Sequence, residues 1–217
     1  MKSLFFAAAA IAALAVGPAN AAAVSGLYNT GVDDNHVALV GASVDDSHYQ
    51  ITASDADPTR IGHQAVTYNC CYIPDNSTVR VVSLDGAGGG AVGTSSYETT
   101  FSLAGFNLST VNITGNYAVD DIGSLFLNGF DTGFGNQNYN IPTAFTLSSG
   151  FNAGLNTLEF KVLNGGGPQS LRVANLQGVG DLAAAVPEPS SWALMLLGVA
   201  SVGAVLRRGR SLAPQTA

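Results

Sequence analysis

The stretch VNITGNYAV, residues 111–119, decides the fold class of this chain. Apolar residues hold most of its odd positions and polar residues most of its even positions. Successive side chains of a β-strand point to opposite faces of a sheet, so this alternation predicts a strand with one buried face. No part of the following region has a sustained helical period of apolar residues.

The same alternation recurs along the chain, most clearly where Leu158, Phe160 and Val162 alternate with Glu159 and Lys161. Further predicted strands are 48–52, 64–68, 79–84, 97–103, 122–127, 144–147 and 171–176. Turn residues such as Asn-Gly at 128–129 separate these runs. Short strands at this spacing predict an all-β fold, an antiparallel two-sheet sandwich of the jelly-roll type.

The amino terminus, residues 1–22, has the features of a secretory signal peptide. Lys2 precedes an apolar run of 13 residues, 4–16, which is too short to span a membrane as a retained anchor. Ala19 and Ala21 form the small-x-small pattern of a signal-peptidase site. We expect cleavage after Ala21 or after one of the two alanines that follow it, and hence an exported protein.

Residues 23–183 are predicted to form one extracellular domain. This region carries four basic residues against fourteen acidic ones, a net charge of −10. Such a surface repels nucleic acid and anionic lipid, so neither is an expected partner. A region of this length buries enough surface to fold without a metal ion or a disulfide.

The two cysteines, Cys70 and Cys71, are adjacent. Neighbouring cysteines close a vicinal disulfide, pair with another chain or stay reduced, and all three alternatives are open. A disulfide that holds a fold together normally links separated strands, so this pair is not expected to have that role.

Motifs of catalysis and of metal binding are missing from the sequence of the domain, since neither G-x-S-x-G nor H-E-x-x-H occurs. No cofactor is predicted, and Ca²⁺ is the alternative, because it prefers hard oxygen ligands. Asp120 and Asp121, at the end of a predicted strand, are its candidate ligands. Loop solvation and turn capping are the competing explanation for this pair.

Two further sets of residues bear on function only if folding brings them together. His36, His48 and His63 would need to converge to bind a metal ion. Glu98 and Glu159 are the only glutamates of the domain, and a hydrolase would need a pocket that holds Glu98 or an aspartate pair with a histidine.

Aromatic side chains that reach the surface together could stack on sugar rings, although packing in the core is the default for each. The candidates are Tyr28, Tyr49, Tyr68, Tyr72 and Tyr139.

Residues 184–217 are predicted to form a linker and a tail. The uncharged run 192–206 would make a helix about 22 Å long, against ~30 Å of bilayer hydrocarbon. We therefore expect a marginal transmembrane helix at about 190–206. Arg207, Arg208 and Arg210, in the basic tail 207–217, would hold its end on the cytoplasmic side.

Pro187, Glu188 and Pro189, the short apolar helix and the arginine cluster follow one another in the order of a known signal. Together they resemble the PEP-CTERM sorting signal of exosortase-equipped Gram-negative bacteria. The resemblance implies that an exosortase recognises the Pro-Glu-Pro motif and processes the chain there. It also implies a transient stay in the inner membrane, then delivery to the cell surface or beyond, in association with exopolysaccharide and biofilm.

The middle of the chain resembles the galactose-binding-like jelly-roll domains often found ahead of such tails. The resemblance rests on GLYNTGV at 26–32, DSHY at 46–49, the Asp-Asp and Asn-Gly pairs at 120–121 and 128–129, and GLNTLEFKV at 154–162. Asp121 stands where such domains usually have Asn. A shared fold does not establish sugar binding. We expect a non-enzymatic surface protein; the alternatives are a carbohydrate- or calcium-binding module and a secreted hydrolase.

Overall fold

The computed structural model describes residues 21–69, 73–183 and 189–210. The chain divides into two compact units, one that ends at Ala183 and one that begins at Ala184. Several residues singled out above lie outside the described ranges: Ala19 with the rest of 1–20, Cys70, Cys71, Tyr72, Pro187, Glu188 and the tail from residue 211.

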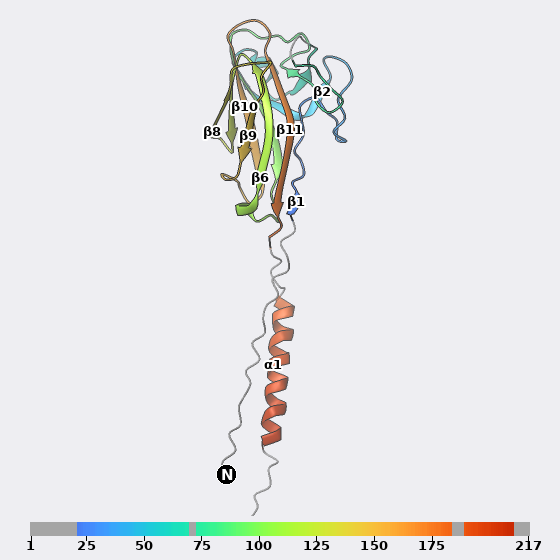
Figure 1. Cartoon of the computed structure of the whole chain (residues 1–217), viewed down its shortest axis with the longest axis vertical. Helices are drawn as coiled ribbons and strands as arrows, with labels where there is room; N and C mark the ends of the chain where they lie inside the picture. Colours follow the sequence, from blue (N-terminus) through green and yellow to red (C-terminus); the bar gives the residue numbers. More distant parts are fainter. Residues whose placement is uncertain (1–20, 70–72, 184–188, 211–217) are drawn as a thin grey trace, which may run out of the picture. The chain divides into compact units, whose positions relative to one another are not determined.

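The unit that ends at Ala183 is built from β-strands (Figure 1), which confirms the all-β prediction. The strands are β1 (Ala21–Ala23), β2 (Asp45–Ser54), β3 (Gln64–Thr67), β4 (Val82–Ser83), β5 (Gly93–Ser102), β6 (Asn112–Asp120), β7 (Ile122–Leu127), β8 (Phe130–Asn136), β9 (Thr143–Leu147), β10 (Leu155–Asn164) and β11 (Ser170–Asp181). Two short 3-10 helices, η1 (Pro58–Arg60) and η2 (Leu108–Thr110), interrupt the loops.

Hydrogen bonds join these strands into one continuous antiparallel sheet, where the sequence predicted two separate sheets. The order is β8-β7-β10-β5-β2-β3-β4-β11-β6-β9, and β1 also pairs with β11. The short strands β3 and β4 connect the two halves of the sheet. The halves still face each other across one core, because the rings of Tyr117 in β6 and Phe160 in β10 lie 5.3 Å apart between centroids.

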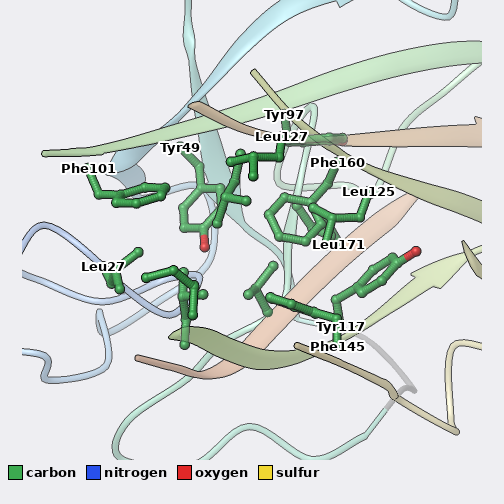
Figure 2. Close-up of a cluster of buried hydrophobic side chains, with 14 of the residues drawn as sticks. Leu27, Tyr49, Tyr97, Phe101, Tyr117, Leu125, Leu127, Phe145, Phe160 and Leu171 are labelled. Atoms are coloured by element: carbon green, nitrogen blue, oxygen red, sulfur yellow. The ribbon is translucent and has the colours of Figure 1, made fainter. Parts of the chain in front are cut away.

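The stretch that predicted the fold class forms most of β6, and its alternation is confirmed. Ile113, Tyr117 and Val119 are buried, whereas Asn112 is exposed. Figure 2 shows Tyr117 with Phe145 and Phe160 in a cluster that also contains Tyr49 and Phe101. The predicted inward residues of β10 are likewise fully buried.

Besides the three-residue β1, the strand that the sequence did not predict is β8. Its sequence, FDTGFGN, has two glycines and little alternation, so its strand character depends on pairing with β7 rather than on a local pattern. The turn between β7 and β8 was predicted, and Asn128 and Gly129 adopt φ angles of 52° and 81° there. Positive φ at both positions suits a tight hairpin turn.

The second unit contains one helix, α1 (Pro189–Arg210), which covers the predicted helix at about 190–206 and extends through the arginines. Of the side chains described in α1, the apolar ones are exposed, among them Leu194, Leu196 and Val199. Within the described ranges, no helix combines the length and the apolar character that a membrane crossing requires. The predicted transmembrane span is therefore not confirmed.

Candidate functional site

A pocket of about 440 Å³ opens where β6 turns into β7, beside the loop that joins β8 to β9. We call it the Tyr139 pocket. Its lining residues are Asp120, Asp121, Ile122, Gln137, Asn138, Tyr139, Asn140 and Ile141. This pocket brings the predicted Asp120 and Asp121 together with one of the five candidate tyrosines.

The buried side chain of Asn136 shapes the loop wall of the Tyr139 pocket. Its Oδ1 accepts hydrogen bonds from the backbone N–H groups of Val119 (3.1 Å) and Asn138 (3.0 Å). Its Nδ2 donates to the carbonyl of Ile141 (2.9 Å) and to Oγ1 of Thr143 (3.1 Å). One amide therefore ties both ends of the loop to the sheet, so the loop is held in shape before any ligand arrives.

Asp121 lines the Tyr139 pocket from the junction between β6 and β7. Its Oδ2 accepts a hydrogen bond of 2.7 Å from the backbone N–H of Gly165, and its own N–H donates to the carbonyl of Leu163. These contacts tie the junction between β6 and β7 to the loop after β10. No described residue donates a hydrogen bond to the other carboxylate oxygen of Asp121, which leaves it available to a ligand.

The Tyr139 pocket is equipped to bind a polyhydroxylated molecule. The side-chain amides of Gln137 and Asn140 make no hydrogen bond to any described residue, and each offers both donors and an acceptor. Tyr139 is 42% exposed and lines the same pocket. Paired planar polar groups suit neighbouring hydroxyls, and an aromatic face suits the C–H groups of a sugar ring.

The predicted motif DSHY has a structural role at a different place. Oδ2 of Asp46 accepts from the backbone N–H of Gly31 (2.6 Å), and its Oδ1 accepts from that of His48 (3.0 Å). The hydroxyl of Tyr49 donates to the carbonyl of Tyr28 (2.8 Å). The motif therefore fastens the opening segment, residues 26–32, to β2.

Two of the three histidines come together, but around a tyrosine. The ring of Tyr28 stacks on the rings of His48 and His36, with distances between ring centroids of 3.5 Å to His48 and 4.6 Å to His36. Nε2 of His48 lies 3.3 Å from a carboxylate oxygen of Asp34, and burial lowers the pKa of His48 while this carboxylate opposes the shift. His63, before β3, is not part of this stack. In the described part of the chain, no three His, Cys, Asp or Glu side chains gather as metal ligands.

The two glutamates face each other on the outer side of the sheet. Glu98 in β5 and Glu159 in β10 are register partners. Oε1 of Glu98 accepts from the hydroxyl of Thr52 (2.9 Å), and Oε1 of Glu159 lies 3.5 Å from Nζ of Lys161. A pocket of about 200 Å³ contains both Glu98 and His48, the combination that a hydrolase would need.

The other predicted residues lie elsewhere. Tyr49 and Tyr68 are buried, so neither offers a stacking surface. Ala21 belongs to β1 and pairs with Asp181 of β11. Pro189 begins α1, and the arginines that follow the apolar run lie in its last turn, with Arg207 exposed.

The pocket residues that sequence reasoning missed are the amides of the loop after β8. The run Gln-Asn-Tyr-Asn, residues 137–140, was the available signal, because it places three amides around one tyrosine in a short loop. This run indicates a binding site only because the structure places Asp121 beside it.

Comparisons with known proteins give one family match and several distant structural similarities. Residues 185–210 match the PEP-CTERM protein-sorting motif. No curated protein matches the chain.

The similar solved structures are all remote in sequence. A CBM35 from Paenibacillus barcinonensis is 15% identical, with a TM-score of 0.31, covering 66% of this chain and 100% of its own. The CBM36-1 domain of a multidomain xylanase from the hindgut metagenome of Trinervitermes trinervoides is 14% identical, with a TM-score of 0.28, covering 77% and 100%. A carbohydrate-binding module CBM36 in complex with calcium and xylotriose is 16% identical, with a TM-score of 0.27, covering 65% and 99%.

Similarity at this level does not define what a domain binds. The match at the carboxyl end is of a different kind, because the apolar helix and the arginines at its end are both in place. The chain carries a PEP-CTERM protein-sorting motif at residues 185–210, which marks it as an exported protein.

Proposed function

We propose that this protein is a non-enzymatic surface protein whose β-domain binds a neutral glycan in the Tyr139 pocket. The observation that carries the proposal is the combination, in one pocket, of an exposed tyrosine, the carboxylate of Asp121 and two amides that make no side-chain hydrogen bond to any described residue. Its volume of about 440 Å³ lies within the usual range of ligand sites. The expected ligand is part of the exopolysaccharide or biofilm around the cell.

The charge of the domain supports a neutral ligand. Residues 23–183 carry a net charge of −10, and Asp120 and Asp121 line the pocket itself. An anionic polymer would meet repulsion both at a distance and on contact.

Binding is tested on an array of neutral and acidic glycans with the full-length protein, followed by calorimetry on the glycans that bind. Tyr139→Ala is expected to lower affinity at least about tenfold, since an aromatic anchor carries much of the energy of such sites. Val40→Ala, at a residue that is 91% exposed and does not line the pocket, is the control and should bind normally. Equal affinity of wild type and Tyr139→Ala would refute the site.

The same titrations with and without Ca²⁺ test the calcium alternative. One carboxylate oxygen of Asp121 accepts no hydrogen bond from a described residue. A Ca²⁺ ion would bind this oxygen in place of a sugar hydroxyl. If binding disappears on chelation and returns with Ca²⁺, the site is a calcium-dependent one.

Sorting is the second part of the proposal. An exosortase-type enzyme would act at Pro187, Glu188 and Pro189, and a signal peptidase near Ala21. Intact-mass measurement of the protein from the cell envelope and the medium is expected to find chains shortened at both ends. Recovery only of chains that still end at Ala217 would contradict processing of the tail.

A secreted hydrolase is the competing function, and the pocket that holds Glu98 and His48 favours it. Glu98 accepts a hydrogen bond from Thr52, and Glu159 pairs with Lys161. These contacts support a structural role for both glutamates on the sheet surface. Release of reducing sugar from a bound glycan by wild type, but not by Glu98→Gln, would establish the hydrolase instead.

A further inference from the structure

The two ends of the sheet, β8 and β9, lie side by side without pairing (Figure 1). Among the described residues, β8 pairs only with β7, and β9 pairs only with β6. Side chains connect the two strands instead, since Asn136 donates to Thr143 and the rings of Phe134 and Phe145 are 6.3 Å apart. We call this line between Phe130–Asn136 and Thr143–Leu147 the β8–β9 seam.

The Tyr139 pocket lies at one end of the seam, where β8 finishes and β9 starts. A second pocket, of about 320 Å³, lies at the opposite end, where β8 starts and β9 finishes. We call it the Phe130 pocket. Because the two strands are antiparallel, one pair of strands carries a pocket at each of its ends.

The Phe130 pocket repeats the chemistry of the Tyr139 pocket. Phe130 is 77% exposed, so an aromatic face is again open to solvent. The carboxylate of Asp131 lines the pocket, and the hydroxyls of Ser148 and Ser149 make no hydrogen bond to described residues. An exposed aromatic ring beside uncommitted polar groups is the same combination that favours a sugar in the first pocket.

The seam between the two pockets is long enough to hold several linked sugar units. The seven residues of β8 extend over about 20 Å, several times the width of one sugar ring. The exposed residues between the two pockets include Gly133 and Gly135 in β8 and Ala144 in β9, so little side-chain bulk stands at these positions.

We propose that one extended neutral polysaccharide chain lies along the β8–β9 seam, with one part in the Tyr139 pocket and another in the Phe130 pocket. This inference rests on the proposed function and adds that the ligand is an internal stretch of a polymer. An extended peptide fits less well, because a new strand needs a regular edge. Gly133 in β8 has a φ of 78°, and the pairing of β8 with β7 shifts register, so this edge is irregular.

The test is the dependence of affinity on ligand length. Full-length protein is titrated with cello-, xylo- and manno-oligosaccharides from disaccharide to hexasaccharide. Affinity is expected to rise at least about tenfold from the shortest to the longest member of the series that binds. Phe130→Ala should remove this gain, because only the longer oligosaccharides reach both pockets.

The two proposals fail in different ways. Tyr139→Ala should weaken binding at every length, and if it does not, the proposed glycan site is wrong. If Tyr139→Ala weakens binding but the hexasaccharide binds no tighter than the disaccharide, only the extended site is overturned. Equal losses at all lengths in Phe130→Ala also overturn it, and Val40→Ala controls for general effects of losing an exposed apolar side chain.

Discussion

At the scale of single residues, Asp46 shows how burial and charge compete in this domain. Its side chain is fully buried, and burial raises its pKa from 3.8 to about 7. The hydrogen bonds from Gly31 and His48 lower the pKa, but by less. Asp46 therefore holds a proton in the folded protein over a pH range in which the unfolded chain has already released it.

The contribution of Asp46 to stability should consequently fall as pH rises from about 4 to 7. In this range Asp46 binds up to one proton more in the folded state than in the unfolded state, so its contribution to the free energy of unfolding decreases as pH rises. The contribution of Asp46 is at most about 4 kcal/mol, is present in full below pH 4 and is lost above pH 7. Asp46→Asn, which has no proton to lose, should show a flatter dependence in denaturant unfolding measured across this range.

Asp45→Asn is the matched control, because Asp45 is the exposed neighbour of Asp46 in β2. The free energy of unfolding of this control should change with pH as steeply as that of the wild type. If Asp46→Asn and wild type lose stability in parallel as pH rises, the assignment to Asp46 is wrong.

At the scale of elements, the close approach of the opening segment to β11 depends on Gly178. A Cβ atom there would lie 2.3 Å from Cδ1 of Ile113, 2.9 Å from Cδ1 of Leu27 and 3.0 Å from Cβ of Val24. Val24 also donates its N–H to the carbonyl of Gly178. The segment after β1 thus packs directly on the strand that precedes the sorting tail.

Gly178→Ala is expected to destabilise the domain by about 1–3 kcal/mol, the usual cost of overpacking a core. Thermal unfolding and proteolysis near the amino terminus would both report it. Gly154→Ala is the control, since its Cβ would have nothing within 4 Å, and it should unfold like the wild type. Equal stability of both variants would mean that the segment does not pack on β11 as described.

The sequence predicted some of the strands and not others. The strands β6 and β10 were predicted because one face of each is buried, and burial leaves a period of two in the sequence. The strand β8 was not predicted, since most of its residues are exposed and only its hydrogen bonds to β7 define it. The short strands β3 and β4 were predicted, but their role in joining the halves of the sheet depends on pairings between distant residues.

At the scale of the whole molecule, the division after Ala183 predicts that the β-domain is stable without the tail. A chain that ends at Ala183 should unfold within about 1 kcal/mol of the full-length protein, since it keeps all eleven strands. A chain that ends at Leu176 should be severely destabilised, because it loses the part of β11 that pairs with β1 and with the start of β6. Denaturant unfolding of the three chains distinguishes these outcomes, and a large loss on removing the tail alone would contradict the division.

The sequence by itself determined the strand class, the buried faces and the sorting tail, because each depends on a local pattern of residues. It also pointed to Asp120 and Asp121, but not to their partners. Only the tertiary structure decided that Tyr139 is the candidate tyrosine beside them and that Phe130 lies at the other end of the same seam. The physical reason is that a pocket forms where loops from separate hairpins meet, and strand pairing between distant residues sets that meeting point.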